Sequence, residues 1–172
     1  MKLIKEIYDS GRSSHQHSDN PYWIRKASRA IVLNERGEAA LLHVTADGYY
    51  KLPGGGLEAG ESIEDALKRE VLEEVGVHIE MDHEIGMIIE YRDQFNQLQI
   101  SYCYMVRVQG EQSVPSFTAT ETEKGFKLCW FSLEECILLM KRNKPEQYVG
   151  SFIVSRDLAF LEEARRTRGV NA

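Results

Sequence analysis

Acidic residues gather in one short segment of the chain, and their spacing suits metal chemistry. A helix advances by ~100° per residue, so Glu70, Glu73 and Glu74 would share one side of a helix. They would lie at the edge of an apolar stripe formed by Ile63, Leu67, Val71 and Val75. A charged, solvated helix face is one interpretation of this pattern. A site for a hard cation such as Mg²⁺, which prefers oxygen ligands, is the other.

Three carboxylates at this spacing repel one another, which costs an isolated helix ~0.2–0.5 kcal/mol per pair. We therefore expect that neutralising Glu73 or Glu74 leaves the fold intact and raises the melting temperature when no metal is bound. A bound cation would remove the same repulsion. If the face is merely solvated, Lys68 and Arg69 are the natural partners of the glutamates.

A run of glycines precedes this helix. Residues 54–56 are all glycine and follow Pro53, and glycine lets the backbone approach another group closely. The run is not the phosphate-binding loop of nucleoside triphosphatases, because no Gly-Lys-Ser/Thr sequence follows it. It leads instead through Glu58 and Glu61 into the helix that carries the carboxylates.

Together these residues resemble the Nudix box. Gly55 is followed after five residues by Glu61 and, after seven more, by Arg69-Glu70-Val71-Leu72-Glu73-Glu74-Val75-Gly76-Val77. Every fixed position of that motif is filled between Gly55 and Val77. The resemblance implies an α/β fold, the Nudix-like α/β/α sandwich with a mixed central β-sheet. It also implies that water attacks a phosphoanhydride bond with the help of Mg²⁺ or Mn²⁺.

The resemblance further implies roles for individual residues. Arg69 would hold the neighbouring glutamates by ion pairing, and Glu61 would be structural. The general base stays open between a box glutamate (Glu70 or Glu73) and two later glutamates, Glu121 and Glu123. The implied metal ligands are Glu70, Glu73 and Glu74, with Glu58 and the Gly55 carbonyl as additional ligands.

The substrate is predicted less closely than the reaction. Lys51 and Arg25 are candidates for binding substrate phosphate, and aromatic residues such as Trp23 are candidates for stacking on a base. Family members that cut ADP-ribose often carry a proline shortly beyond the box, and residues 91–94 here contain none. We expect a nucleoside triphosphate, oxidised or not, that yields a nucleoside monophosphate and pyrophosphate. The alternatives are a dinucleoside polyphosphate, an ADP-sugar, or a non-catalytic domain that senses a nucleotide.

The strands that must position the box are predicted from the alternation of side chains. Residues 85–91 and 98–108 should form two strands with a polar turn between them. In the second, Ile100 and Tyr102 alternate with Gln99 and Ser101, which predicts one better-buried face. A hairpin is expected for residues 27–33 and 39–44, and a further strand for residues 127–131.

Three helices and two loops complete the predicted elements. The first helix should begin at Ser62, with a capping box to Asp65, and end at Gly76. The second should begin at Ser132, with a capping box to Glu135. The third should cover residues 151–166, and the polar segments 10–21 and 118–124 should be loops.

The composition limits the classes of partner. The length of 172 residues favours a single domain over 1–172, with an N-terminal extension at 1–22 and a C-terminal helix at 151–172. The formal net charge of −6 argues against binding to DNA or RNA polymers. The three cysteines form no disulfide or zinc motif, and neither a signal peptide nor a membrane span is recognisable, so we expect a cytoplasmic protein. A homodimer is left open, and the pair His15 and His17 is interpreted as solvent-exposed.

Overall fold

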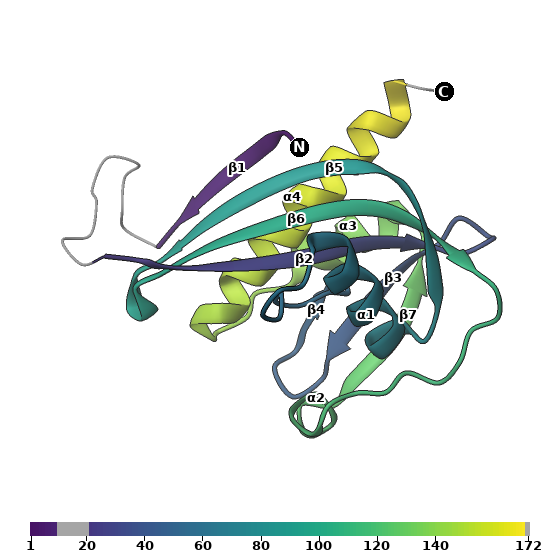
Figure 1. Cartoon of the computed structure of the whole chain (residues 1–172), viewed down its shortest axis with the longest axis horizontal. Coiled ribbons are helices and arrows are strands. Elements are labelled where there is room, and N and C mark those ends of the chain that lie inside the picture. Colours follow the sequence, from purple (N-terminus) through teal and green to yellow (C-terminus); the bar gives the residue numbers. More distant parts are fainter. Residues whose placement is uncertain (10–20, 171–172) are drawn as a thin grey trace.

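The computed structural model describes residues 1–9 and 21–170, which form a curved mixed β-sheet with helices on both faces (Figure 1). The described sheet has seven strands in the order β1-β5-β6-β2-β3-β4, with β7 paired to β3. The strands are β1 (Leu3–Tyr8), β2 (Trp23–Leu33), β3 (Ala39–Val44), β4 (Tyr49–Lys51), β5 (His78–Arg92), β6 (Gln97–Gln109) and β7 (Phe126–Phe131). The helices are α1 (Ile63–Val75), α2 (Ala119–Glu123), α3 (Leu133–Arg142) and α4 (Tyr148–Val170).

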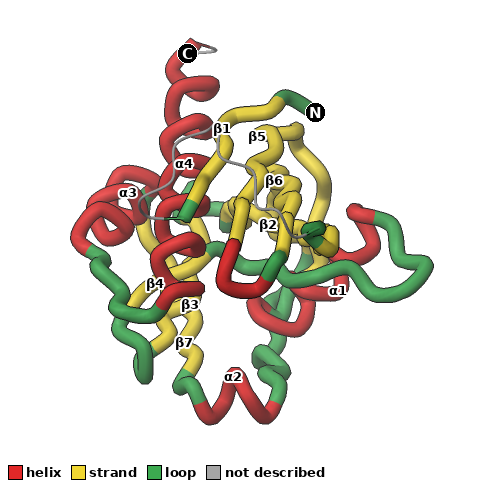
Figure 2. The backbone as a smooth tube through the Cα atoms, turned by 90° about the vertical axis from the view of Figure 1, so that its left-hand side faces the viewer, coloured by secondary structure: helices red, strands yellow, loops and turns green. Residues whose placement is uncertain are grey.

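The sheet lies between two helical layers, with α1 on one side and α3 and α4 on the other (Figure 2). Val71 of α1 and Ala30 of β2 belong to one buried cluster. Phe160 of α4 and Ile31 of β2 belong to a larger cluster on the opposite face. Because β2 runs parallel to β6 while β5 and β6 are antiparallel, the sheet is mixed. The predicted α/β/α sandwich is confirmed.

The two strands and the turn of the predicted hairpin between residues 27–33 and 39–44 are present, but their antiparallel pairing is short. β2 and β3 pair only at Leu33 and Ala39. The middle of β2 pairs instead with Pro53 and the glycine run, along the edge that faces away from β6. The Ser28 N–H donates to the Gly55 carbonyl at 2.9 Å, and the Ala30 N–H donates to the Pro53 carbonyl at 3.0 Å. This pairing holds the start of the Nudix box against β2.

Toward the start of β6, the better-buried face is the polar one. Gln99 and Ser101 are fully buried, whereas Ile100 and Tyr102 remain partly exposed. The reason is that α4 covers the first of these faces, while α1 covers only part of the second. The alternation itself was predicted correctly.

The helix ends follow the predicted capping with small differences. Ser62 accepts a hydrogen bond from the Asp65 N–H, but the Asp65 carboxylate accepts from the Ser62 hydroxyl, so the box is only half formed. Gly76 ends α1 in the left-handed region, with φ of +76°. The capping box of Ser132 with Glu135 is complete.

Several elements were not predicted. Residues 118–124 were expected to be a loop, yet they contain α2, whose capping box joins Thr118 and Glu121. The edge strands β1 and β4 were not predicted, β5 begins earlier than expected at His78, and α4 begins at Tyr148. The predictions for His15 and His17 lie outside the described residues.

Candidate active site

Arg69 is the centre of the Nudix box in this structure. Its Nε and Nη2 atoms each donate to Glu61 at 2.9 Å, a bidentate pair that fixes the guanidinium plane. Nη2 also reaches the Gly56 carbonyl at 3.1 Å, and Nη1 donates to Glu70 at 2.9 Å and lies 3.5 Å from Glu73. Hydrogen bonds from Arg69 hold the pKa of Glu61 at about 2. The geometry agrees with the expected roles of Arg69 and Glu61.

Glu70 lies directly against the glycine run. A Cβ atom on Gly55 would sit 2.1 Å from Glu70 Oε1, so only glycine leaves room for this carboxylate beside the loop backbone. Arg69 orients one of the two oxygens. The Gly55 carbonyl itself accepts a hydrogen bond from the Ser28 N–H, and Glu58 lies exposed on the loop that follows. The Glu70 carboxylate is an oxygen ligand of the kind that a hard divalent cation prefers.

Glu73 lies one turn further along α1 and is more open to solvent. Its side chain is 41% exposed, and burial is still the main cause that raises its pKa. The charge of Arg69 lowers that pKa, while Glu70, Glu121 and Glu58 raise it. A carboxylate surrounded by other carboxylates is well placed to share a cation with them.

Glu74 is bound to groups outside α1. It is 1% exposed, with Oε1 at 2.7 Å from the Lys51 ammonium and Oε2 accepting from the Gly54 N–H at 2.6 Å. Burial raises the pKa of Glu74, and Lys51 lowers it. Lys51, expected to bind substrate phosphate, is therefore engaged inside the protein and also lies over the Phe126 ring.

The predicted ligand set is not drawn together as one cluster. Among residues 1–9 and 21–170, no three His, Cys, Asp or Glu side chains are grouped closely enough to hold a metal ion. The assignment of Glu70, Glu73 and Glu74 as ligands therefore stays a prediction.

The structure separates the two later glutamates that were candidates for the general base. Glu121 is half-buried at the start of α2, accepts a hydrogen bond from the Thr118 N–H at 2.8 Å, and is close enough to raise the pKa of Glu73. Glu123 is exposed at the end of the same short helix. The charge of Glu121 is among those that raise the pKa of Glu73 in the box.

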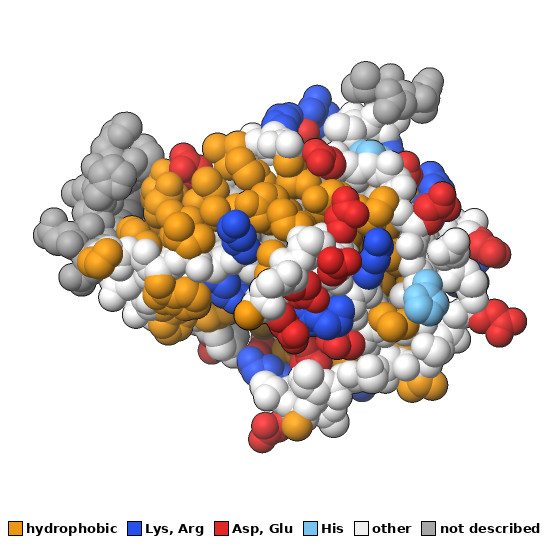
Figure 3. All heavy atoms as spheres, viewed as in Figure 1, with side chains coloured by type: hydrophobic (Ala, Val, Ile, Leu, Met, Phe, Trp, Pro, Cys, Tyr) orange, Lys and Arg blue, Asp and Glu red, His pale blue; other side chains and the backbone are white. Residues whose placement is uncertain are grey.

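A groove of about 660 Å³ opens between the start of β2 and the glycine-rich loop. Arg25 lines it and packs against Gly56, where a Cβ atom would lie 2.7 Å from the Arg25 Nη2. The other lining residues include Trp23, whose ring is 52% exposed, and the box residue Glu61. The groove places an arginine and an open indole beside the acidic residues of the box, which Figure 3 shows as red and blue side chains next to an apolar face.

A second polar group lies buried beneath α4, and the sequence analysis did not find it. Arg156 Nε donates to Asp157 at 2.7 Å, and Arg156 Nη1 lies 3.5 Å from Glu90. Gln99 donates to the same Glu90 oxygen at 2.7 Å and accepts a hydrogen bond of 2.6 Å from Arg25. This chain of contacts runs from the groove into the interior and fixes the position of the Arg25 guanidinium. The polar residues on alternate positions of β6 were the signal for it.

Arg29 lies in the same interior. It is 5% exposed and has no ion pair with any residue of the described chain. Burial and, secondly, the charge of Arg156 lower its pKa to about 10. A buried guanidinium without a carboxylate partner is costly, so this interior carries an excess of positive charge next to the candidate site.

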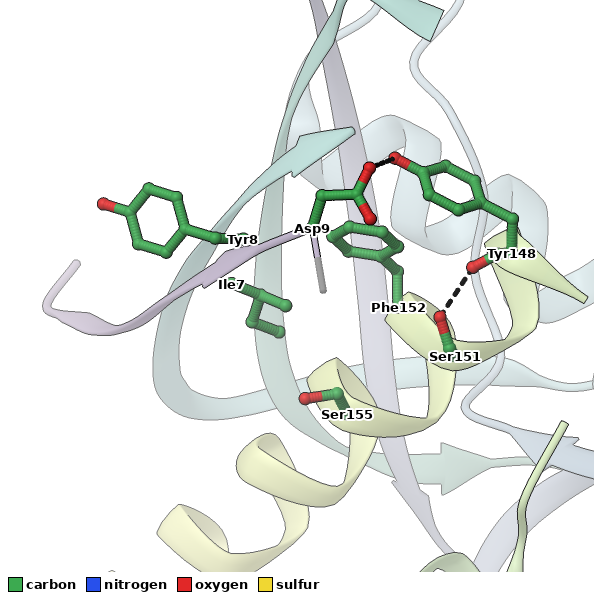
Figure 4. Close-up of a pocket in the computed structure, with 7 residues that line it drawn as sticks. All are labelled: Ile7, Tyr8, Asp9, Tyr148, Ser151, Phe152 and Ser155. Carbon is green, nitrogen blue, oxygen red and sulfur yellow. Dashed lines mark hydrogen bonds between the residues drawn. The ribbon is translucent and has the colours of Figure 1, made fainter. Parts of the chain in front are cut away.

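A smaller hollow of about 200 Å³ lies at the end of β1, against the first turns of α4 (Figure 4). The Tyr148 hydroxyl donates to Asp9 at 2.8 Å across it. Tyr8 turns its ring away from this hollow and stacks on Tyr91 with ring centres 4.7 Å apart. None of the residues that line the hollow belongs to the Nudix box.

Comparison with known proteins agrees with the geometry of the box. The model of the NUDIX domain matches residues 23–150. A putative 8-oxo-dGTP diphosphatase from Bacillus subtilis (strain 168) is 32% identical over 117 residues, which cover 68% of this chain and 72% of that protein. Diphosphoinositol polyphosphate phosphohydrolase 3-alpha from Mus musculus is 26% identical over 134 residues, covering 73% and 75%.

Solved structures support the same fold. The MutT protein from Methanosarcina mazei Go1 superposes with a TM-score of 0.58 at 21% identity, covering 88% of this chain and 99% of that one. The chain belongs to the Nudix family, and it is a hydrolase that acts on pyrophosphate bonds. No helix in the described residues is long and apolar enough to cross a membrane.

Proposed function

We propose that this protein is a divalent-cation-dependent hydrolase that cuts a nucleoside triphosphate, oxidised or not, into a nucleoside monophosphate and pyrophosphate. The observation that carries this proposal is the groove beside the box. It offers the exposed Trp23 for stacking on a base and the guanidinium of Arg25 for a phosphate, beside the box residues Glu58 and Glu61. A relative named as a putative 8-oxo-dGTP diphosphatase supports the same substrate class.

The residues of the box divide the work of positioning. Arg69 holds Glu70 and Glu61 in place; Glu61 lines the groove, and Glu70 and Glu73 offer oxygen atoms on α1. A divalent cation, Mg²⁺ or Mn²⁺, held by Glu70 and Glu73 would offset the phosphate charge and polarise the phosphoryl group. Glu121 is the candidate that would take the proton from the attacking water, because it approaches the same carboxylates from another element.

The groove also distinguishes the alternatives. An inositol polyphosphate, the substrate class named for the 26% identical mouse relative, has no base to stack on Trp23. A dinucleoside polyphosphate or an ADP-sugar does carry a base, so these two remain as alternatives. A non-catalytic domain that senses a nucleotide is the alternative of another class, and the complete set of box glutamates counts against it.

A hydrolysis screen tests the proposal directly. Purified protein should be incubated with dGTP, 8-oxo-dGTP, diadenosine tetraphosphate, ADP-ribose and a diphosphoinositol polyphosphate, with Mg²⁺, with Mn²⁺ and with EDTA. We expect metal-dependent release of pyrophosphate from a nucleoside triphosphate. Turnover of only the inositol compound would refute the substrate class, and binding without turnover of any compound would favour the sensor.

Substitutions test where the nucleobase of the substrate binds. Trp23→Ala should raise KM for a nucleoside triphosphate by ~10-fold, because stacking contributes ~1–3 kcal/mol per base. Leu138→Ala is a matched control, since Leu138 is equally open at 52% exposure but lies on α3. An equal KM for both variants would show that the base binds elsewhere.

A further inference from the structure

One face of the sheet remains apolar and uncovered over four neighbouring strands. α1 packs over the part of this face that holds Tyr104 and Val106. Beyond it, half-exposed or exposed apolar side chains continue across β6, β5 and β1 and the start of β2, where Ile24 is 63% exposed and Leu3 is 43% exposed. Figure 3 shows them as a continuous apolar surface to one side of the acidic box. We call this surface the open face.

The register of the strands arranges the open face in three rows. Each row takes one residue from β1, β5, β6 and β2 in that order, because paired residues of neighbouring strands stand side by side on the same face. The rows are Leu3, Met87 and Tyr102, which lead to the buried Ser28; Glu6, Ile89, Ile100 and Lys26; and Tyr8, Tyr91, Leu98 and Ile24. Outside α1, the face is therefore apolar at its centre.

The middle row ends in opposite charges. Glu6 stands at the β1 edge, where it accepts a hydrogen bond of 2.9 Å from the Tyr91 hydroxyl. Lys26 stands at the β2 edge, is exposed, and has no ion pair within the described part of the chain. The two charges are separated by Ile89 and Ile100, so they cannot satisfy each other within one copy.

We propose that the open face binds a second copy of this chain in a twofold-symmetric homodimer. Consider a twofold axis that runs parallel to the strands between β5 and β6. It reverses the order of the strands, so β1 of each copy lies over β2 of the other. Glu6 then meets Lys26 of the partner subunit, and the same pair forms a second time across the axis. The apolar centre packs on itself, as in an isologous interface.

The size of the open face sets the strength of this association. Four strands spaced ~4.8 Å apart, each contributing about five residues with a rise of ~3.3 Å, give a patch of roughly 19 by 17 Å. That is smaller than the ~800 Å² per partner of a standard stable interface. The dimer should therefore form in a concentration-dependent manner, with a dissociation constant in the micromolar range.

Sedimentation equilibrium of the full chain from ~1 to ~200 µM tests the proposal without reference to its enzymatic activity. We expect a reversible monomer–dimer equilibrium. Glu6→Lys and Lys26→Glu should each weaken it by at least ~10-fold, because like charges would face each other across the axis. The double variant with both changes should recover most of the affinity, since it restores opposite charges at both ends.

Matched apolar variants complete the test. Ile24→Asp, at an exposed position of the open face, should abolish the dimer, whereas Leu138→Asp, at a similarly exposed position on α3, should leave it unchanged. Circular dichroism and melting curves establish that each variant is folded. A protein that stays monomeric at ~200 µM, a larger assembly, or a dimer indifferent to Ile24→Asp and to the charge exchange would each overturn the proposal.

Discussion

Neutralising Glu74 should destabilise this protein by about 3 kcal/mol, which is opposite in sign to the effect expected from the sequence. The sequence predicts repulsion among three carboxylates on one side of α1, so Glu74→Gln should raise the melting temperature. In the structure Glu74 instead accepts from Lys51 at 2.7 Å and from the Gly54 N–H at 2.6 Å, and it is 1% exposed. The change removes a stabilising charge, not a repulsive one.

The magnitude follows from what glutamine can keep. Its single carbonyl oxygen can accept from Gly54 or from Lys51, so one charge-assisted bond worth ~1.5–3 kcal/mol is lost. Lys51 is then left buried without a counter-charge, and breaking a buried pair on one side costs ~3–5 kcal/mol. We take about 3 kcal/mol, because the remaining dipole still contacts the ammonium. For a chain of this size that lowers Tm by roughly 6–12 °C.

Urea denaturation with EDTA and without substrate measures the effect. Lys51→Met should cost a similar amount, and the double variant should lose at least ~1.5 kcal/mol less than the sum of the two, because the groups interact directly. Glu73→Gln is the matched control, since Glu73 is 41% exposed and should change stability by no more than ~1 kcal/mol. If Glu74→Gln matched or exceeded the stability of the parent, the buried pair would not exist in solution.

Three further predictions concern the box and its surroundings. Mg²⁺ at 100 times its Kd should stabilise the parent protein by ~2.7 kcal/mol in melting curves, and the Glu70→Gln variant should lose most of this gain. A parent protein whose melting temperature changes with neither Mg²⁺ nor Mn²⁺ would exclude a metal site. Glu121→Gln keeps its capping box, and it should lower kcat ~10²-fold and alter the acidic limb of the pH–rate profile, whereas Glu123→Gln should do neither. If both variants had the pH–rate profile of the parent, the general base would be a glutamate of α1. The pKa of Glu61 falls from 4.5 to about 2 in the fold, so its stabilising effect is present above pH 4.5 and lost as the pH falls through 2. The difference in unfolding free energy between the parent and Glu61→Gln should therefore shrink over that range, and a constant difference would contradict the assignment.

The parts of the site that lie close together in the sequence could be predicted well. The bidentate bond from Arg69 to Glu61 spans eight residues, and it joins a loop to the first turns of the following helix. The contact of Glu70 with Gly55 depends on the same loop and helix. The resemblance of residues 55–77 to the Nudix box implied that Arg69 pairs with neighbouring glutamates, and such pairs form over short separations along the chain.

The orientation of Glu74 could not be predicted in the same way. The helical wheel places it at the edge between the apolar stripe and the carboxylates, where it can turn to either side. Its choice depends on Lys51, which reaches it only because β4 pairs with β3 and leads into the glycine run. β4 has three residues and no recognisable alternation, so the strand that supplies the counter-charge was not predicted.

The faces of β6 show why periodicity alone leaves a fold incomplete. Alternation fixes that Gln99 and Ile100 point in opposite directions, but not which of them faces the interior. Arg156 and Asp157 on α4 decide this, because a helix that buries an ionic pair needs polar partners on the sheet beneath it, and Gln99 and Glu90 supply them. In the first half of β6, Gln99 and Ser101 are therefore buried, and Ile100 and Tyr102 are left on the open face. An inference that ranks the faces of a strand by hydrophobicity fails wherever the covering helix is itself charged.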